Sequence, residues 1–275
     1  MVRLILLGII LGMSVSSFSQ ETPYLELVKA ESELSSLFRE LYSDTLTESD
    51  KVLDRILQKM PVALEMEGAM EYPWNGFERI GVVSSDDRKI RVFTWHVEDD
   101  PDNFRYFGFV QVELRRGRVR VVELVDNGKK QRDLYQLDQS AGNWYGKLYY
   151  GIVTTQHRRE TIYTLLGMDF NNRRSTLKTV EAMEIRRNRP NFLQERFFNG
   201  RDLVDRLVLE YSSQVAISVR WDPEMKMITF DHLVPFHQVY SGNYEFYGPD
   251  GSFDGLAFTD GVWVYRQDID ARNRD

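Results

Sequence analysis

The segment from Glu245 to Tyr265, EFYGPDGSFDGLAFTDGVWVY, places oxygen-bearing side chains at alternate positions. Asp250, Ser252 and Asp254 are followed directly by Gly255. Oxygen ligands at positions 1, 3 and 5 and a glycine at position 6 form the first half of a hand-type calcium loop. Position 12 of such a loop needs a bidentate glutamate, but here it is Gly261. A hand-type site is therefore not completed.

A looser calcium site would combine Asp250 and Asp254 with Asp260 or Asp268, because calcium accepts irregular cages of oxygen ligands. The same residues are also common in turns. The Pro-Asp-Gly run at 249–251 and the Asp-Gly pair that begins at Asp260 are typical of β-turns, where Asp bonds its own backbone and Gly adopts positive φ. We expect two turns around a short strand here, and no bound metal.

A second candidate group lies in the segment FDHLVPFH, which contains Asp231, His232 and His237. Two imidazoles and a carboxylate can bind zinc or form a His–Asp pair for acid–base chemistry. If the segment is a strand, His232 shares one face with Ile228 and Phe230, and Asp231 faces the other way. His237 lies beyond a proline. We therefore expect His232 to be a hydrogen-bonded histidine of the core.

Aromatic residues form two clusters along the chain, which are Trp144, Tyr145, Tyr149 and Tyr150, and then Tyr240, Tyr244, Phe246 and Tyr247. Exposed rings of this kind would stack on sugar rings or bases. In a β-rich protein without disulfides, aromatic pairs across strands are expected core material. We expect both clusters to be buried.

The basic residues are concentrated in the middle of the chain. Residues 79–206 carry 24 basic and 18 acidic residues, a net of +6, within a chain of net charge −7. Arginine pairs at 115/116, 158/159, 173/174 and 186/187 fall in or near expected turns. Such pairs can bind an anionic glycan or nucleic acid. Their places at loop tips favour solubilising turn residues, and no nucleic-acid partner is expected.

Standard catalytic motifs are absent from the sequence. It contains no G-x-S-x-G, no phosphate-binding loop, no G-x-G-x-x-G and no H-E-x-x-H. It also contains no cysteine, which excludes disulfides, a thiol nucleophile and thiolate metal sites. We expect no cofactor.

The N-terminus has the features of a secretory signal peptide. Arg3 precedes an apolar stretch from Leu4 to Val15, and the small residues Ser17 and Ser19 precede Gln20. We predict cleavage after residue 19 and export to the periplasm or cell surface, with an uncleaved anchor as the alternative. No later apolar run approaches the ~20 residues of a membrane helix, so no transmembrane segment is expected after cleavage.

Residues 20–68 form the predicted helical segment. Thr22 and Pro23 suit the start of a first helix, whose apolar stripe includes Leu27, Leu34 and Leu41. A second helix starts at a capping box formed by Thr47 and Asp50, and Pro61 ends or kinks it. Since two short amphipathic helices cannot bury their stripes alone, we expect them to pack on a sheet or a partner. The segment 175–187 is a third helix candidate, with Ser175 as its cap.

Residues 69–275 form the predicted β-rich domain. Alternating apolar and polar residues predict about ten to twelve strands, joined mainly as hairpins. Successive hairpins indicate antiparallel pairing. We expect a mainly β fold, namely an antiparallel sandwich or a strongly curved meander, that forms one folding unit with the helices. An irregular β-propeller is the alternative.

The segments NWYGKLYYGIV, IYTLLGMD, ITFDHLVP, FYGPDGSFDG and DIDARN resemble a group of exported proteins of Bacteroidota with no known activity. The resemblance covers most of the chain from Ile90 onward. It implies an envelope location and a single domain. It implies no catalytic residue.

Two functions follow as expectations. The first is a non-catalytic exported envelope protein that binds a protein or glycan partner. The alternative is a hydrolase of envelope polymer that uses acidic residues and His232 of the C-terminal third, with or without a metal. An enzyme requires several ionisable groups in one cleft, so convergence of Asp231, His232, Asp250 and Asp254 would favour the hydrolase.

Overall fold

The computed structural model describes residues 18–43, 49–100, 102–127, 134–136 and 138–270. Nearly all of the predicted signal peptide, which is residues 1–19, lies outside these ranges, and so does Thr47 of the predicted capping box. Within the described residues, no helix is long and apolar enough to cross a membrane.

Two helices lead the fold. They are α1 (Phe18–Leu41) and α2 (Ser49–Leu64). Helix α1 begins four residues before Thr22, so the prediction of Thr22 as its cap is wrong and Pro23 lies inside the helix. Pro23 is the sixth residue of α1, so it removes one hydrogen bond from the second turn of the helix. Helix α2 continues three residues beyond Pro61.

Fifteen strands follow within the described residues. They are β1 (Gly81–Ser84), β2 (Ile90–Asp100), β3 (Asn103–Glu113), β4 (Val119–Val125), β5 (Leu148–His157), β6 (Glu160–Asp169), β7 (Ser175–Arg186), β8 (Arg189–Phe192), β9 (Phe197–Phe198), β10 (Leu203–Val204), β11 (Arg206–Ser212), β12 (Val219–Asp222), β13 (Met227–Pro235), β14 (Tyr247–Thr259) and β15 (Val262–Arg266). Short 3₁₀ turns lie between some of the strands, namely η1 (Arg115–Gly117), η3 (Gln238–Tyr240) and η4 (Tyr244–Phe246). The mainly β, antiparallel prediction is confirmed, with more strands than the ten to twelve expected.

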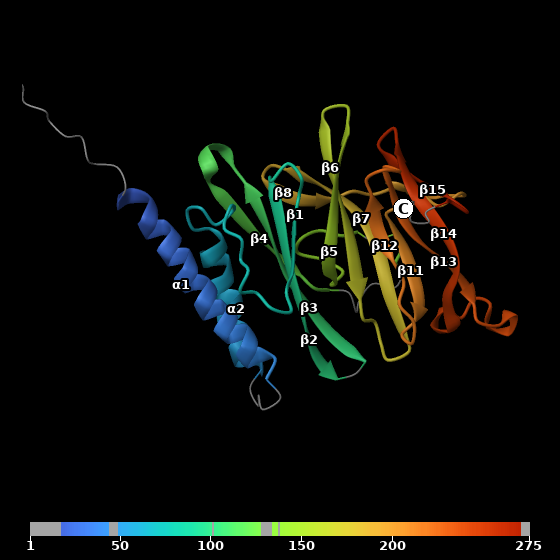
Figure 1. Ribbon diagram of the computed structural model, residues 1–275, viewed down its shortest axis with the longest axis horizontal. Coiled ribbons are helices and arrows are strands. Elements are labelled where there is room, and N and C mark those ends of the chain that lie inside the picture. The colour runs from blue at the N-terminus through green and yellow to red at the C-terminus, as the bar shows by residue number, and fades with distance from the viewer. Residues whose placement is uncertain (1–17, 44–48, 101, 128–133, 137, 271–275) are drawn as a thin grey trace, which may run out of the picture.

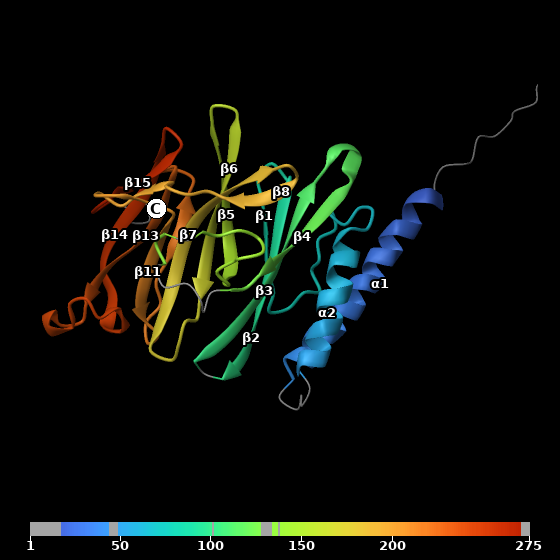
Figure 2. The same cartoon turned by 180° about the vertical axis from the view of Figure 1, so that it is seen from behind.

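The strands form three sheets, which we call the first, second and third sheet. Their orders are β1-β2-β3-β4, then β11-β7-β6-β5 with β8 beside β7, then β10-β9-β15-β14-β13-β12. All pairings are antiparallel except that of β15 with β9. The helices and the three sheets follow one another along the long axis of the molecule (Figures 1 and 2). This stack of layers differs from the repeated blades of the propeller alternative.

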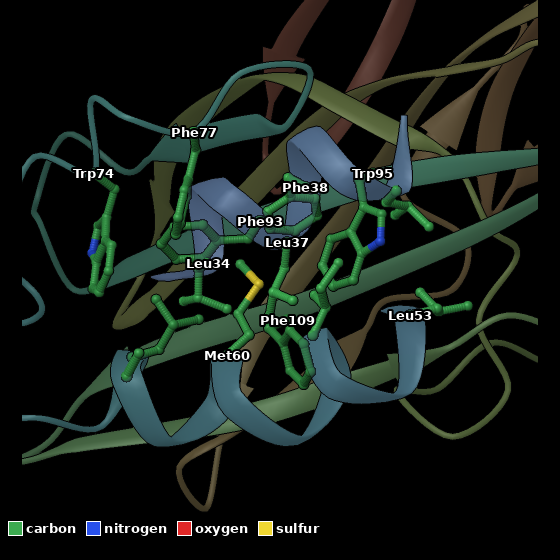
Figure 3. Packing of buried hydrophobic residues seen from close by; sticks show 14 of the residues in the cluster. Leu34, Leu37, Phe38, Leu53, Met60, Trp74, Phe77, Phe93, Trp95 and Phe109 are labelled. Atoms are coloured by element: carbon green, nitrogen blue, oxygen red, sulfur yellow. The ribbon is translucent and has the colours of Figure 1, made fainter. Parts of the chain in front are cut away.

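Each interface between layers has its own apolar core. One lies between the helices and the first sheet, a second between the first and second sheets, and a third between the second and third sheets. The stripe of α1 is buried as predicted, with Leu27, Leu34 and Leu41 all in the first core. Figure 3 shows Leu34 and Phe38 of α1 facing Trp95 and Phe109 of the first sheet.

The prediction of a helix over 175–187 is wrong, because residues Ser175–Arg186 form β7. This strand pairs with β6 on one side and β11 on the other, and most of its side chains are buried. Helix-forming residue types over this segment are overridden by the ladder bonds and burial that two neighbouring strands supply. The error matters because β7 carries Glu181, a central residue of the site described below.

Candidate functional site

The third sheet brings together residues from two of the candidate groups. The Nδ1 atom of His232 on β13 lies 2.7 Å from Oδ2 of Asp254 on β14. The hydroxyl of Tyr265 on β15 donates to the same carboxylate oxygen, and the backbone N–H of Asp268 donates to Oδ1 at 3.0 Å. The side chain of Asp254 is 4% exposed, whereas that of His232 is 27% exposed. The carboxylate is thus enclosed by donors while the imidazole reaches solvent.

The cross-strand register explains this arrangement. Phe230 pairs with Asp254 and Leu256 pairs with Tyr265, so these side chains share one face of the sheet. Burial and the Asp254 carboxylate raise the pKa of Tyr265, which keeps its hydroxyl protonated as a donor. A carboxylate at Nδ1 of His232 holds a ring proton there, so Nε2 is the basic nitrogen of the neutral ring. This is the orientation that a general base requires.

The calcium-like segment is built differently from the expected pair of turns. Strand β14 runs without a break from Tyr247 to Thr259 and contains a bulge at residues 250–252, opposite His232. Asp250 accepts bonds from the N–H and the hydroxyl of Ser252, which lower the pKa of its carboxyl, and Gly251 has a φ of 89°. The first expected turn is therefore a β-bulge. The second is confirmed, since Asp260 and Gly261 have φ values of 50° and 84° and join β14 to β15.

The predicted metal ligands do not form one cage. Asp250 and Ser252 bond each other, Asp254 faces His232 and Tyr265, and Asp260 lies in the turn after β14. Among the residues that the structure describes, no group of three or more His, Cys, Asp or Glu side chains is placed to hold a metal ion.

The catalytic candidates also separate. Oδ2 of Asp231 accepts a bond from the N–H of Ser218 at 2.6 Å, on the side away from His232. The Nδ1 atom of His237 accepts a bond from the N–H of Val239 at 3.3 Å, beyond the end of β13. Of the predicted catalytic and metal-binding residues that the structure describes, His232 and Asp254 are the two that form a contact between neighbouring strands. Their contact could not be predicted, because it depends on the bulge at residues 250–252, which sets the register of β14 against β13.

Sequence reasoning missed a charged network between the first and second sheets. Oε2 of Glu181 lies 2.8 Å from Nζ of Lys147 and 2.8 Å from Nη2 of Arg206, and all three side chains are at most 2% exposed. Tyr149 donates to the other oxygen of Glu181, and the indole N–H of Trp144 donates to the hydroxyl of Tyr149 at 2.9 Å. The network lies inside the protein, in contact with aromatic rings.

Burial and charge act differently on the two ends of this network. Burial, together with the neighbouring Arg206, lowers the pKa of Lys147 to about 7. Burial alone would raise the pKa of Glu181, but the charges of Arg206 and Lys147 outweigh it and lower that pKa to about 2. Glu181 therefore remains ionised at neutral pH, with Arg206 as its permanent counter-ion.

A second buried carboxylate extends the network. Asp169 accepts bonds from the hydroxyls of Tyr106 at 2.8 Å and Tyr145 at 2.6 Å, and from the N–H of Asn171. Burial first, and then the Asp169 charge, raise the pKa of both tyrosines, so they remain donors. A signal existed in the sequence at Glu181, an acidic residue between the apolar residues Val180 and Ala182 of β7. The helix assigned to 175–187 hid the inward direction of Glu181.

The loop between β13 and β14 is the most exposed aromatic feature of the third sheet. It projects from the end of the layer stack (Figure 1). Phe236, Tyr240 and Tyr244 are exposed, and Val239 is 75% exposed. The prediction that this second aromatic cluster is buried is therefore wrong for Tyr240 and Tyr244. These residues lie outside any strand pair, so no neighbouring strand covers them.

Internal contacts nevertheless hold the loop in one conformation. The rings of Tyr240 and Phe246 stack with centroids 4.3 Å apart, and the N–H of Phe236 donates to the carbonyl of Phe246 at 2.9 Å. The Tyr247 hydroxyl accepts a bond from the N–H of Gly242. Beside the loop, a groove of about 190 Å³ is lined by Tyr244 and Tyr247 and by residues of β11 that include Glu210.

The first aromatic cluster follows the prediction more closely. Trp144, Tyr145 and Tyr149 are buried, and only Tyr150 is exposed.

Comparison with protein-family models, curated proteins and solved structures gives no match. The function is therefore inferred from the residues of this chain, and the resemblance to exported proteins of Bacteroidota stays a prediction.

Proposed function

We propose that this chain is a non-catalytic exported protein of the cell envelope that binds a protein or glycan partner. The observation that carries the proposal is the aromatic loop, defined as residues 236–246 between β13 and β14, with the adjoining groove. Exposed rings held in place by their own contacts lose little conformational entropy on binding. Their flat faces suit both sugar rings and apolar side chains of a protein.

The composition of the loop supports the same role. Between Phe236 and Tyr247 it contains tyrosine, serine, glycine and asparagine. These are the residue types of adaptable recognition loops, where tyrosine supplies contact area and the small polar residues supply hydrogen bonds. At the groove, the carboxylate of Glu210 lies beside tyrosine rings, which combines a hydrogen-bond acceptor with stacking surfaces.

The test removes the exposed rings and leaves the fold. The variant Tyr240→Ser/Tyr244→Ser is compared with the wild type in co-sedimentation with purified cell-wall polysaccharide and in crosslinking within the envelope fraction. Loss of two central tyrosines is expected to weaken binding about tenfold or more. Tyr24→Ser, at an exposed tyrosine of α1, is the matched control and should bind like the wild type. Equal binding by the double variant would contradict the proposal.

Export has its own test. Cleavage after residue 19 predicts that protein recovered from the envelope fraction begins at Gln20, as read by N-terminal sequencing. A mature chain that begins at Met1 would contradict the signal peptide.

A hydrolase of envelope polymer is the second candidate, and the pairing of His232 with Asp254 favours it. Such an enzyme would use Nε2 of His232 as its base. Purified protein incubated with cell-wall polysaccharide should then release soluble fragments, and His232→Ala should abolish the release. If the wild type releases no soluble fragments, the hydrolase proposal is contradicted and binding remains the proposed function.

A further inference from the structure

Four turns of the first and second sheets lie at one end of the molecule. They join β1 to β2, β3 to β4, β5 to β6 and β7 to β8, and Figure 1 shows them on the same side of the stack. Hydrogen bonds link the neighbouring turns. The N–H of Glu113 donates to the carbonyl of Lys89 at 2.8 Å, and the N–H of Asp86 donates to the hydroxyl of Thr154 near the end of β5 at 3.3 Å. We call residues 85–89, 113–118, 157–160 and 184–189 the basic end.

The basic end carries a surplus of positive charge. It holds ten basic and five acidic residues, a net of +5 in a chain of net charge −7. The ten basic side chains are all exposed, and none makes a hydrogen bond or ion pair with another described residue. They are Arg88, Lys89, Arg115, Arg116, Arg118, Arg158, Arg159, Arg186, Arg187 and Arg189. Nine of the ten are arginine, whose planar fork binds phosphate through two parallel hydrogen bonds.

Each of the four turns also places an arginine in left-handed backbone. The φ values are 57° at Arg88, 65° at Arg116, 56° at Arg158 and 52° at Arg187. Glycine or asparagine adopts this conformation more readily than a long side chain does. Four turns therefore keep a positive charge where backbone preference favours another residue.

The arrangement favours a flat partner over a threaded chain. The charges stand on the tips of separate hairpins, and no exposed large apolar side chain of the described residues lies in these four turns. The N-terminal end of α1, with Tyr24 and Leu25 exposed, lies at the same end of the molecule.

We propose that the basic end docks onto the surface of a lipid bilayer that carries anionic phospholipid. The arginines contact phosphate groups at the headgroup level, with no insertion of the turns into the hydrocarbon. Each basic residue close to an anionic bilayer strengthens binding about fivefold, and salt weakens the attraction over a Debye length of ~10 Å. This inference is independent of the partner proposed for the aromatic loop.

The test measures co-sedimentation with vesicles of phosphatidylcholine alone and of equal parts phosphatidylcholine and phosphatidylglycerol, using the chain as recovered from the envelope. Arg158→Glu/Arg159→Glu reverses two charges of the basic end. The matched control is Arg173→Glu/Arg174→Glu, at the β6–β7 turn, where the arginines pair with Asp102 and Glu245. Both variants change the net charge equally.

The wild type should bind the anionic vesicles, bind neutral ones far less, and dissociate in about 1 M salt, where the Debye length is ~3 Å. Arg158→Glu/Arg159→Glu should weaken binding about 25-fold or more, while the control keeps the affinity within about threefold. Arg116→Gly/Arg158→Gly/Arg187→Gly should also weaken binding, with a Tm at or above that of the wild type because glycine relaxes the three turns.

Three results would overturn the proposal. The first is equal binding to neutral and anionic vesicles. The second is an equal loss of binding in the control pair, which would reduce the effect to net charge. The third is binding of heparin through the same arginines without any binding to anionic vesicles, which would make the partner a soluble anionic polymer. The two proposals can fail separately. If the wild type binds anionic vesicles but Tyr240→Ser/Tyr244→Ser binds cell-wall polysaccharide and envelope proteins as well as the wild type does, the basic end is supported and the role of the aromatic loop is contradicted.

Discussion

Glu181 and Asp254 are both buried carboxylates on strands, and each accepts a hydrogen bond from a tyrosine hydroxyl. Their other partners differ. Glu181 meets Lys147 and Arg206, whose side chains are also buried, whereas Asp254 meets His232, whose side chain reaches solvent. All charged partners of Glu181 are therefore buried between the sheets, whereas the partner of Asp254 is partly exposed to solvent.

Because of this difference, substitutions around the two carboxylates should change stability to different extents. A buried carboxylate shared by two buried cations cannot be removed without leaving uncompensated charge inside the protein. The imidazole of His232 is bonded at Nδ1 and partly exposed, so water can replace a partner lost at this site. Substitutions in the Glu181 network should therefore change stability strongly, and substitutions around Asp254 should change it less.

Glu181→Gln should have the largest effect. It leaves Lys147 and Arg206 side by side in the core without their shared counter-ion, which is expected to cost about 3–5 kcal/mol of unfolding free energy. Chemical denaturation measures the loss. Glu184→Gln on the same strand is the matched control, because Glu184 is half-buried and accepts a bond from Asn191 only. If Glu181→Gln loses no more unfolding free energy than the control does, the buried ion pairs do not depend on Glu181 as their shared counter-ion.

The pH dependence of stability should come next in size. The pKa of Lys147 is about 7 in the folded chain, because of burial and Arg206, and is ~10.4 in an unfolded chain. Between these values the unfolded state binds more protons, so unfolding free energy rises as pH increases from about 7 to 9. The slope is at most about 1.4 kcal/mol per pH unit. The destabilising charge is fully present below pH 7.

Lys147→Met checks the assignment, since it removes the titrating group and keeps the length of the side chain. Denaturation midpoints at several pH values between 7 and 9 should then become flat. A wild-type stability that falls with pH in this range would contradict a depressed pKa of Lys147.

The sequence predicted local features better than distant pairings. The stripe of Leu27, Leu34 and Leu41 is encoded within one helix, so its burial could be read from spacing alone. The hydrogen bond of His232 was predicted from the alternation along β13, but its place in the core was predicted wrongly, since the side chain is 27% exposed. Its partner Asp254 was not predicted, because a bulge at residues 250–252 shifts the register of β14 against β13.

The buried network needed information that no local pattern contains. Lys147, Glu181 and Arg206 come from segments far apart in the sequence, and they meet only because β7 is a central strand between β6 and β11. Residues such as Leu177, Ala182 and Met183 favour a helix locally, and tertiary pairing overrides that preference. A helix would have placed Glu181 at no particular position relative to the other charges.

Tyr265→Phe should have a moderate effect. It removes one donor from Asp254 while His232 and the N–H of Asp268 remain, so the expected cost is about 0.5–1.5 kcal/mol. Tyr240→Phe is the matched control, because its exposed hydroxyl makes no hydrogen bond with another described residue. The control should stay within about 0.5 kcal/mol of the wild type. If Tyr265→Phe loses as much unfolding free energy as Glu181→Gln does, Asp254 depends on its buried partners as strongly as Glu181 does.

Calcium should have the smallest effect. Asp254 is already enclosed by His232, Tyr265 and Asp268, and Asp250 bonds Ser252, so the two carboxylates are not free to share an ion. A ligand that binds only the folded state at 100 times its Kd would add ~2.7 kcal/mol of stability. We expect the thermal midpoint to be the same with millimolar calcium as with a chelator. A higher midpoint with calcium that Asp254→Asn abolishes would instead make this carboxylate a metal ligand, and its contact with His232 would then be secondary.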